Sequence, residues 1–168
     1  LYDGVFQYNN TVGGYEELAQ KKTDIFIGAA PSKEQIAYAE ENGTLYGKYP
    51  RSLIDLLERN PETEDFVLHY PLEKDEPIEV DLSEYDDCPG VPLFLQWDRQ
   101  WGRMEYGGKP AALTGCGPLC LSMAAYYLTG DGAFSPDKMI EFAARNGYYA
   151  NGSGSKWTLI SEGAKELG

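Results

Sequence analysis

Apolar residues recur at helical spacing in several stretches after residue 50. The pattern predicts helices over residues 53–59, 118–128, 136–145 and 156–167. Ser135-Pro136 and Asn146-Gly147 are typical start and stop signals around the third of these helices. Ser52 is the expected cap of the first helix, and Ser155 and Gly168 bracket the fourth. We therefore expect a largely helical region in this part of the chain.

The first 47 residues show a different pattern. A short apolar run, Ile25-Phe26-Ile27, precedes a polar helical stretch at about residues 32–41, and Asn42-Gly43 ends that stretch. The Ser32 hydroxyl can cap the helix, and Gln35, three residues later, can reach back in a capping box. These signals predict a strand, loop and helix unit.

Residues 62–89 are acidic and interrupted by prolines. Apolar residues at 66–68 and 77–82 predict extended segments, so we interpret the stretch as a strap over a domain surface. A charge run is most often a solvated face, and the alternative is steering of a charged substrate.

Three aromatic residues, Trp97, Trp101 and Tyr106, follow a strand-like apolar run at residues 91–96. Aromatic rings this dense can form a platform that stacks on a sugar or a base. These rings lie between an apolar run and the helix predicted over 118–128, and each can remove about 150–250 Å² from water. We therefore favour a buried, structural role for all three.

The charge balance excludes several kinds of partner. The chain has 14 Lys and Arg against 27 Asp and Glu, a formal net charge of −13. Such a charge repels nucleic acid and anionic membrane surfaces. No stretch approaches the roughly 20 apolar residues of a membrane span, so we expect no direct membrane insertion. The chain begins at Leu1 without a basic, apolar signal, and we expect any targeting segment to be absent from these residues.

The cysteines are Cys88, Cys116 and Cys120. Their spacing fits no paired zinc motif, so we expect no structural metal and no other cofactor. The predicted helix over 118–128 carries an apolar stripe, which we expect to face the core. The stripe consists of Leu119, Cys120, Met123, Ala124, Tyr127 and Leu128. Cys120 is therefore expected to be a packing residue.

Cys116 stands in a different setting, the sequence Gly115-Cys116-Gly117-Pro118. Pro118 suits the first turn of a helix, so Cys116 is expected just ahead of the helix. A helix N-terminus presents free N–H groups and a partial positive charge, which favour thiolate over thiol. The two glycines leave the thiol unshielded and let a substrate backbone approach. Cys116 is thus a candidate nucleophile, although a free cysteine is also often a simple packing residue.

Gln96 ends the apolar run that precedes Cys116. A glutamine amide at such a place can donate a hydrogen bond to an oxyanion that develops during acyl transfer. Taken alone, this signal is weak, because glutamine is common on protein surfaces, and an ordinary surface glutamine is the favoured interpretation.

Residues 49–168 resemble exported bacterial domains similar to family 39 cysteine peptidases, a papain-like group whose best-known members cleave double-glycine leader peptides. The motifs that carry the resemblance occur in order along the chain. They are Tyr49-Pro50-Arg51-Ser52-Leu53, Asn60-Pro61-Glu62-Thr63, Phe66-Val67, Gln96-Trp97-Asp98, Trp101-Gly102, Gly115-Cys116-Gly117-Pro118 and Leu128-Thr129-Gly130-Asp131. The resemblance implies that Cys116 is the nucleophile and that Gln96 contributes to the oxyanion hole.

The chain departs from this family in one important respect. Papain-like enzymes use a His to accept the thiol proton and an Asn or Asp to orient that His, and in this family both follow the nucleophile. No His follows Cys116 in this sequence. The single histidine, His69, precedes Cys116 at about the spacing seen in caspases, roughly 50 residues. The residues around Cys116 do not match the caspase signature, so we interpret His69 as non-catalytic.

Residues 11–43 resemble part of the phosphate-binding proteins that serve ABC transporters. The matching segments are Gly14-Tyr15-Glu16-Glu17-Leu18, Thr23-Asp24-Ile25-Phe26-Ile27 and Pro31-Ser32-Lys33-Glu34-Gln35. In that family an acidic residue before the Pro accepts a hydrogen bond from phosphate. Ala29 and Ala30 stand there in this chain. The family's phosphate loops are also missing, so we expect no phosphate binding.

Together these observations predict an α+β chain. Residues 1–47 are expected to be a solute-binding-like fragment, and residues 48–168 an incomplete papain-like cysteine peptidase domain. The expected function is peptide-bond attack through an acyl-enzyme on a peptide or protein substrate, incomplete or inactive in the chain as written. The alternative is a non-catalytic peptide-binding or solute-binding module. Both resembled families act outside the cytoplasm, so we expect an exported or cell-surface protein.

Overall fold

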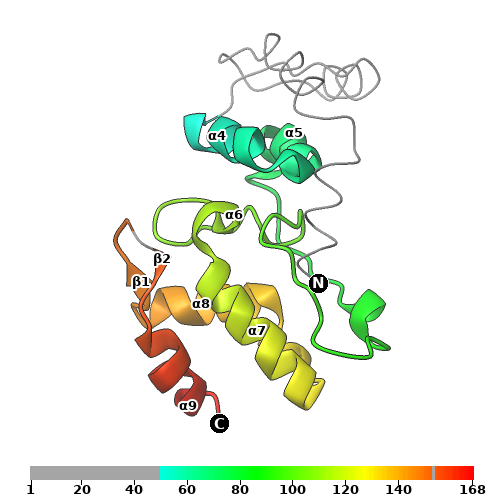
Figure 1. Ribbon diagram of the computed structural model, residues 1–168, viewed down its shortest axis with the longest axis vertical. Coiled ribbons are helices and arrows are strands. Elements are labelled where there is room, and N and C mark those ends of the chain that lie inside the picture. Colours follow the sequence, from blue (N-terminus) through cyan, green and yellow to red (C-terminus); the bar gives the residue numbers. More distant parts are fainter. Residues whose placement is uncertain (1–49, 153) are drawn as a thin grey trace. The chain divides into compact units, whose positions relative to one another are not determined.

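The computed structural model describes residues 50–152 and 154–168 (Figure 1). The chain divides into two units between residues 75 and 76. The boundary expected near residue 47, the solute-binding-like fragment and its predicted helix all lie outside the described residues.

The described part of the first unit consists of α4 (Arg51–Arg59), a 3-10 turn η1 (Pro61–Thr63) and α5 (Glu64–Glu73). Helix α4 confirms the helix predicted over 53–59 and begins two residues earlier, after Pro50, so Ser52 lies inside it and does not cap it. Its apolar side chains at 53, 54, 56 and 57 are buried, as the amphipathic pattern requires.

The prediction of an extended strap over residues 62–89 is wrong for the first half of that stretch. Residues 66–68 are helical and buried in α5, and Pro71 lies in the last turn of that helix. A proline late in a helix costs less than one in the middle, because few backbone hydrogen bonds remain to be disrupted. Within residues 76–110 the one regular element is the 3-10 turn η2 (Ser83–Tyr85), so this later segment is irregular.

The second unit carries a series of helices and one hairpin (Figure 1). In chain order its remaining elements are α6 (Ala111–Thr114), α7 (Cys116–Thr129), η3 (Gly132–Phe134), α8 (Pro136–Arg145), β1 (Tyr149–Ala150), β2 (Gly154–Ser155), η4 (Leu159–Gly163) and α9 (Ala164–Glu166). The antiparallel strands pair Tyr149 with Ser155 and Ala150 with Gly154. At this coarse level the chain is α+β, as expected.

The predicted helix limits were accurate where strong end signals occur. Helix α8 spans the predicted residues 136–145, with Pro136 at its first position. The helix predicted over 156–167 starts later. It consists of the π-helical turn η4 followed by α9, and Trp157 ahead of it is 90% exposed. Ser155 belongs to β2 and is not a helix cap.

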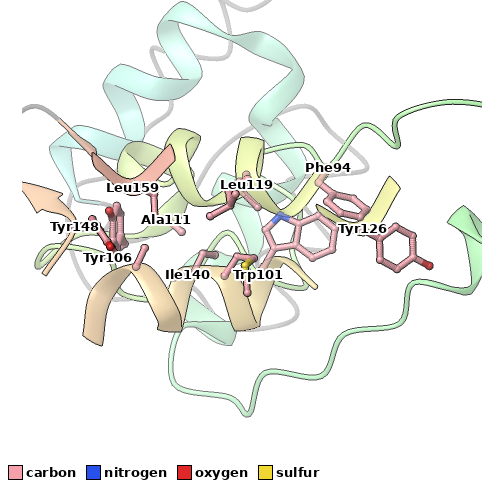
Figure 2. Packing of buried hydrophobic residues seen from close by; sticks show 12 residues of the cluster. Phe94, Trp101, Tyr106, Ala111, Leu119, Tyr126, Ile140, Tyr148 and Leu159 are labelled. Atoms are coloured by element: carbon pink, nitrogen blue, oxygen red, sulfur yellow. The ribbon is translucent and has the colours of Figure 1, made fainter. Parts of the chain in front are cut away.

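The core of the second unit is rich in aromatic side chains (Figure 2). Trp101 and Tyr106 have no exposed surface, which confirms the structural role predicted for them. The Trp101 ring packs edge-on against Phe94, with centroids 5.6 Å apart, and its Nε1 donates to the carbonyl of Leu95 at 2.8 Å. Trp97 is only half-buried and is not part of this core, so the buried role predicted for all three aromatic residues is wrong for Trp97.

The run at residues 91–96 is not a strand, yet it alternates between core and solvent. Pro92 and Phe94 are buried, whereas Val91, Leu93 and Leu95 are exposed. The segment therefore anchors the unit through alternate residues without pairing to a strand within the described residues.

Helix α7 packs with the opposite face from the one we predicted. Its buried residues are Pro118, Leu119, Leu121, Ser122 and Tyr126. Of the predicted core stripe only Leu119 is buried, and Cys120, Ala124, Tyr127 and Leu128 are exposed. The helix contains no charged residue, so apolar spacing alone could not identify its buried side.

Candidate active site

Cys116 is exposed and is the first residue of α7. The sequence placed it just ahead of the helix, and the structure places it one step further on, with Gly115 as the N-terminal flanking residue. In the described part of the chain, the N–H groups of Cys116 and Gly117 have no backbone acceptor and no side-chain cap. Pro118 has no N–H. The thiol therefore stands at a helix N-terminus with two free donors beside it.

The glycines around Cys116 are required by the protein's own packing. A β-carbon on Gly115 would lie 2.8 Å from the Ala111 carbonyl oxygen. A β-carbon on Gly117 would overlap the Ser155 hydroxyl and lie 2.6 Å from Ser155 Cβ. The space beside these glycines is thus already filled, and strand β2 lies directly on the first turn of α7. We predicted that these glycines let a substrate backbone approach. The packing within the protein is enough to explain why both positions are glycine.

Gln96 lies near the start of α6. Its side-chain nitrogen donates to the carbonyl oxygens of Ala111, at 2.9 Å, and Ala112, at 3.0 Å. The Ala111 oxygen also accepts from the Gly115 N–H at 2.7 Å. The Gln96 amide and the N–H of the residue before Cys116 thus share one acceptor, which holds Gln96 close to Cys116. Both amide hydrogens are engaged in this arrangement, so donation to an oxyanion would require one of these bonds to yield.

Tyr106 and Ser155 form the polar surroundings of the thiol. Their hydroxyl oxygens are 2.9 Å apart. A β-carbon on Gly154, beside Ser155, would lie 3.9 Å from Cys116 Sγ. Burial raises the pKa of Tyr106, the hydrogen bond to Ser155 opposes this shift, and the nearby charge of a Cys116 thiolate adds to it. Sequence reasoning missed Ser155 because no local pattern shows that the hairpin packs on α7.

Cys120 lies one helical turn beyond Cys116 and is exposed, so its expected role as a core residue is wrong. Partial desolvation raises the pKa of the Cys120 thiol, and the charge of Cys116 raises it further. A raised pKa leaves less of this thiol as thiolate at neutral pH. Cys88 is also exposed, in the irregular segment before the core.

His69 lies in α5, in the first unit, and not in a strap. Its Nδ1 is 2.8 Å from the Asp65 carbonyl oxygen and 3.2 Å from Asp65 Oδ1, so the ring is held by its own helix. It is the chain's single histidine. The unit that contains Cys116 therefore carries no imidazole.

No group of three or more side chains suited to a metal occurs in the described residues. Over the same residues, no helix has the length and apolar character needed to cross a bilayer. An open groove of about 610 Å³ lies along the C-terminal part of α7. Its lining includes Asp81, Asp86, Asp137 and Lys138, so it is predominantly acidic and does not favour an anion.

In comparisons with known proteins, no family model, no curated protein and no solved structure matches the chain.

Proposed function

We propose that this chain carries the nucleophile-bearing part of a papain-like cysteine peptidase of the family 39 type, with Cys116 as its nucleophile and a peptide or protein as substrate. One observation carries the proposal: Cys116 is an exposed thiol at the first position of a 14-residue helix, and the leading N–H groups of this helix have no acceptor among the described residues. The motifs listed above and the position of Gln96 beside the same turn agree with it.

In the proposed reaction the Cys116 thiolate attacks a peptide carbonyl carbon. The carbonyl oxygen becomes an oxyanion, which the free N–H of Cys116 can bind. Gln96 would contribute its amide after releasing one of its two carbonyl acceptors. The amine then leaves with a proton, and water hydrolyses the resulting thioester.

The proton transfers in this reaction need a base that also acts as an acid. His69 belongs to the other unit and is bonded to Asp65. With no imidazole in the unit of Cys116, we propose that this chain as written has little or no turnover. An exported or cell-surface location also belongs to this proposal, because the resembled families act there.

A peptide that ends in a vinyl sulfone tests the proposal, since it must bind before it alkylates. We expect saturable labelling of Cys116 that is much faster than labelling by the same electrophile without the peptide. Cys116→Ser should abolish the labelling, and Cys120→Ser is the matched control that should retain it. Equal rates with and without the peptide would refute a peptide-directed nucleophile.

The alternative is a non-catalytic peptide-binding module. The absence of an imidazole from the unit of Cys116 favours it, because binding requires no proton transfer. In that case Cys116→Ala should bind peptides as tightly as the parent protein, and mass spectrometry should detect no thioester in the parent.

A further inference from the structure

The hairpin residue Ser155 and the buried residue Tyr106 form a hydroxyl pair that the resemblance did not identify. Tyr106 has no exposed surface and lies at one end of the core beside Tyr148 and Leu159 (Figure 2). Ser155 is half-buried in β2. The two oxygens are 2.9 Å apart, so one hydroxyl donates and the other accepts.

Burial decides which hydroxyl is the donor. If Ser155 donated, the Tyr106 proton would need another acceptor inside the core, and no other acceptor for the Tyr106 hydroxyl occurs among the described residues. A buried donor without an acceptor is costly. Tyr106 is therefore the donor, which leaves the Ser155 proton available for a second partner.

The position of Ser155 limits what that partner can be. Its side chain lies over the first turn of α7, close enough to exclude even a methyl group on Gly117. The neighbouring Gly154 also lies close to the thiol: a β-carbon on Gly154 would lie 3.9 Å from Cys116 Sγ. Cys116 is the exposed side chain of that turn, and its Sγ lies on the side that faces β2.

We propose that Ser155 is a positioning residue that donates its hydroxyl hydrogen to the Cys116 thiolate, and that Tyr106 orients Ser155 for this donation. The inference rests on the proposed function, in which Cys116 is the nucleophile. In this arrangement Ser155 supplies the thiolate with a neutral hydrogen-bond donor, in a unit that has no imidazole.

Other titratable groups lie on α7 or on the elements near it. Helix α6 and strand β2, which pack against α7, carry no titratable side chain. Tyr149 packs edge-on against the Tyr106 ring at 5.3 Å, and Cys120 lies one turn along α7. The charged residues of the other elements packed on α7 are Asp137, Lys138, Glu141, Arg145 and Glu162. Asp137 is paired with Lys138 at 3.3 Å.

The test is the rate of Cys116 alkylation by iodoacetamide as a function of pH, measured on the full chain by peptide mapping. For Ser155→Ala we expect the midpoint of the profile to move about one unit to higher pH, with a roughly tenfold lower rate at neutral pH and an unchanged plateau at high pH. Tyr106→Phe should move the midpoint in the same direction by a smaller amount. Tyr149→Phe is the matched control, since it removes a neighbouring hydroxyl outside the pair, and its profile should equal that of the parent.

Two outcomes would overturn the inference. One is a Ser155→Ala profile identical to that of the parent. The other is an equal loss of rate at every pH, including the plateau, which would show that Ser155 controls access to the thiol and not its ionisation. Failure of the proposed function is distinguishable, because the parent's Cys116 would then react no faster than Cys88.

Discussion

Trp101→Ala tests the core that supports the candidate site. Trp101 has no exposed surface, packs against Phe94 and donates from Nε1 to Leu95. A buried aromatic side chain removes about 150–250 Å² from water, worth roughly 4–6 kcal/mol at about 25 cal/mol per Å². Measured truncations of buried Trp and Phe cost about 3–5 kcal/mol. We therefore expect Trp101→Ala to lower the free energy of unfolding by about 3–5 kcal/mol.

Trp97→Ala is the matched control, because Trp97 is half-buried and lies outside the core. It should cost about 1–2 kcal/mol, since part of its ring already contacts water. Urea unfolding followed by circular dichroism measures both variants. For a folding unit of under 100 residues, each kcal/mol shifts the melting temperature by roughly 4–8 °C, so Trp101→Ala should melt more than about 10 °C below the parent. Equal costs for the two variants would refute this account of the core.

Three further predictions concern the surroundings of the core. Gly117→Ala should destabilise the protein by about 1–3 kcal/mol in urea unfolding, because the added methyl overlaps Ser155, whereas Gly132→Ala, where a methyl meets nothing, should cost far less. Gln96→Ala should cost about 1–3 kcal/mol, because the partly buried Ala112 carbonyl loses its side-chain donor and the Ala111 carbonyl keeps only the Gly115 N–H; a cost near zero would contradict the observed bonds. Burial, followed by the charge of Glu84, raises the pKa of Tyr85 from 10.0 to about 12. The unfolded tyrosine loses its proton first, so stability present below pH 10 should fall as the pH rises toward 12. Tyr85→Phe should make the fall in unfolding free energy between about pH 9 and 11.5 less steep. Tyr127→Phe is the control, because the Tyr127 ring is exposed, and it should leave the slope unchanged.

Local signals predicted the parts of the fold that local interactions determine. Pro136 and Asn146 mark the ends of α8 in both the sequence and the structure. The Gly-Cys-Gly-Pro segment correctly indicated a helix start, and Cys116 is exposed there. Helix α5 was missed because its acidic composition and Pro71 resemble those of a loop, although its apolar residues 66–68 are buried.

The remaining features depend on contacts that a one-dimensional pattern does not contain. Helix α7 is apolar on all sides, so the burial of Leu121 in place of Cys120 follows from its contacts with α8 and not from its spacing. The approach of Ser155 to Gly117 likewise requires the hairpin to fold back on α7. The family resemblance assigned Gln96 to an oxyanion hole, but its two carbonyl acceptors could not be foreseen from the sequence.

The most direct test of the central claim is a competition among the cysteines of the native protein. Limiting iodoacetamide at pH 6.5 to 7 would be followed by peptide mapping of Cys88, Cys116 and Cys120, all of which are exposed. Because Cys116 alone stands at a helix N-terminus with free N–H groups, we predict that it is labelled first and several-fold faster than the other two. Equal labelling of the exposed cysteines, or labelling of Cys120 or Cys88 ahead of Cys116, would contradict the assignment of Cys116 as the nucleophile.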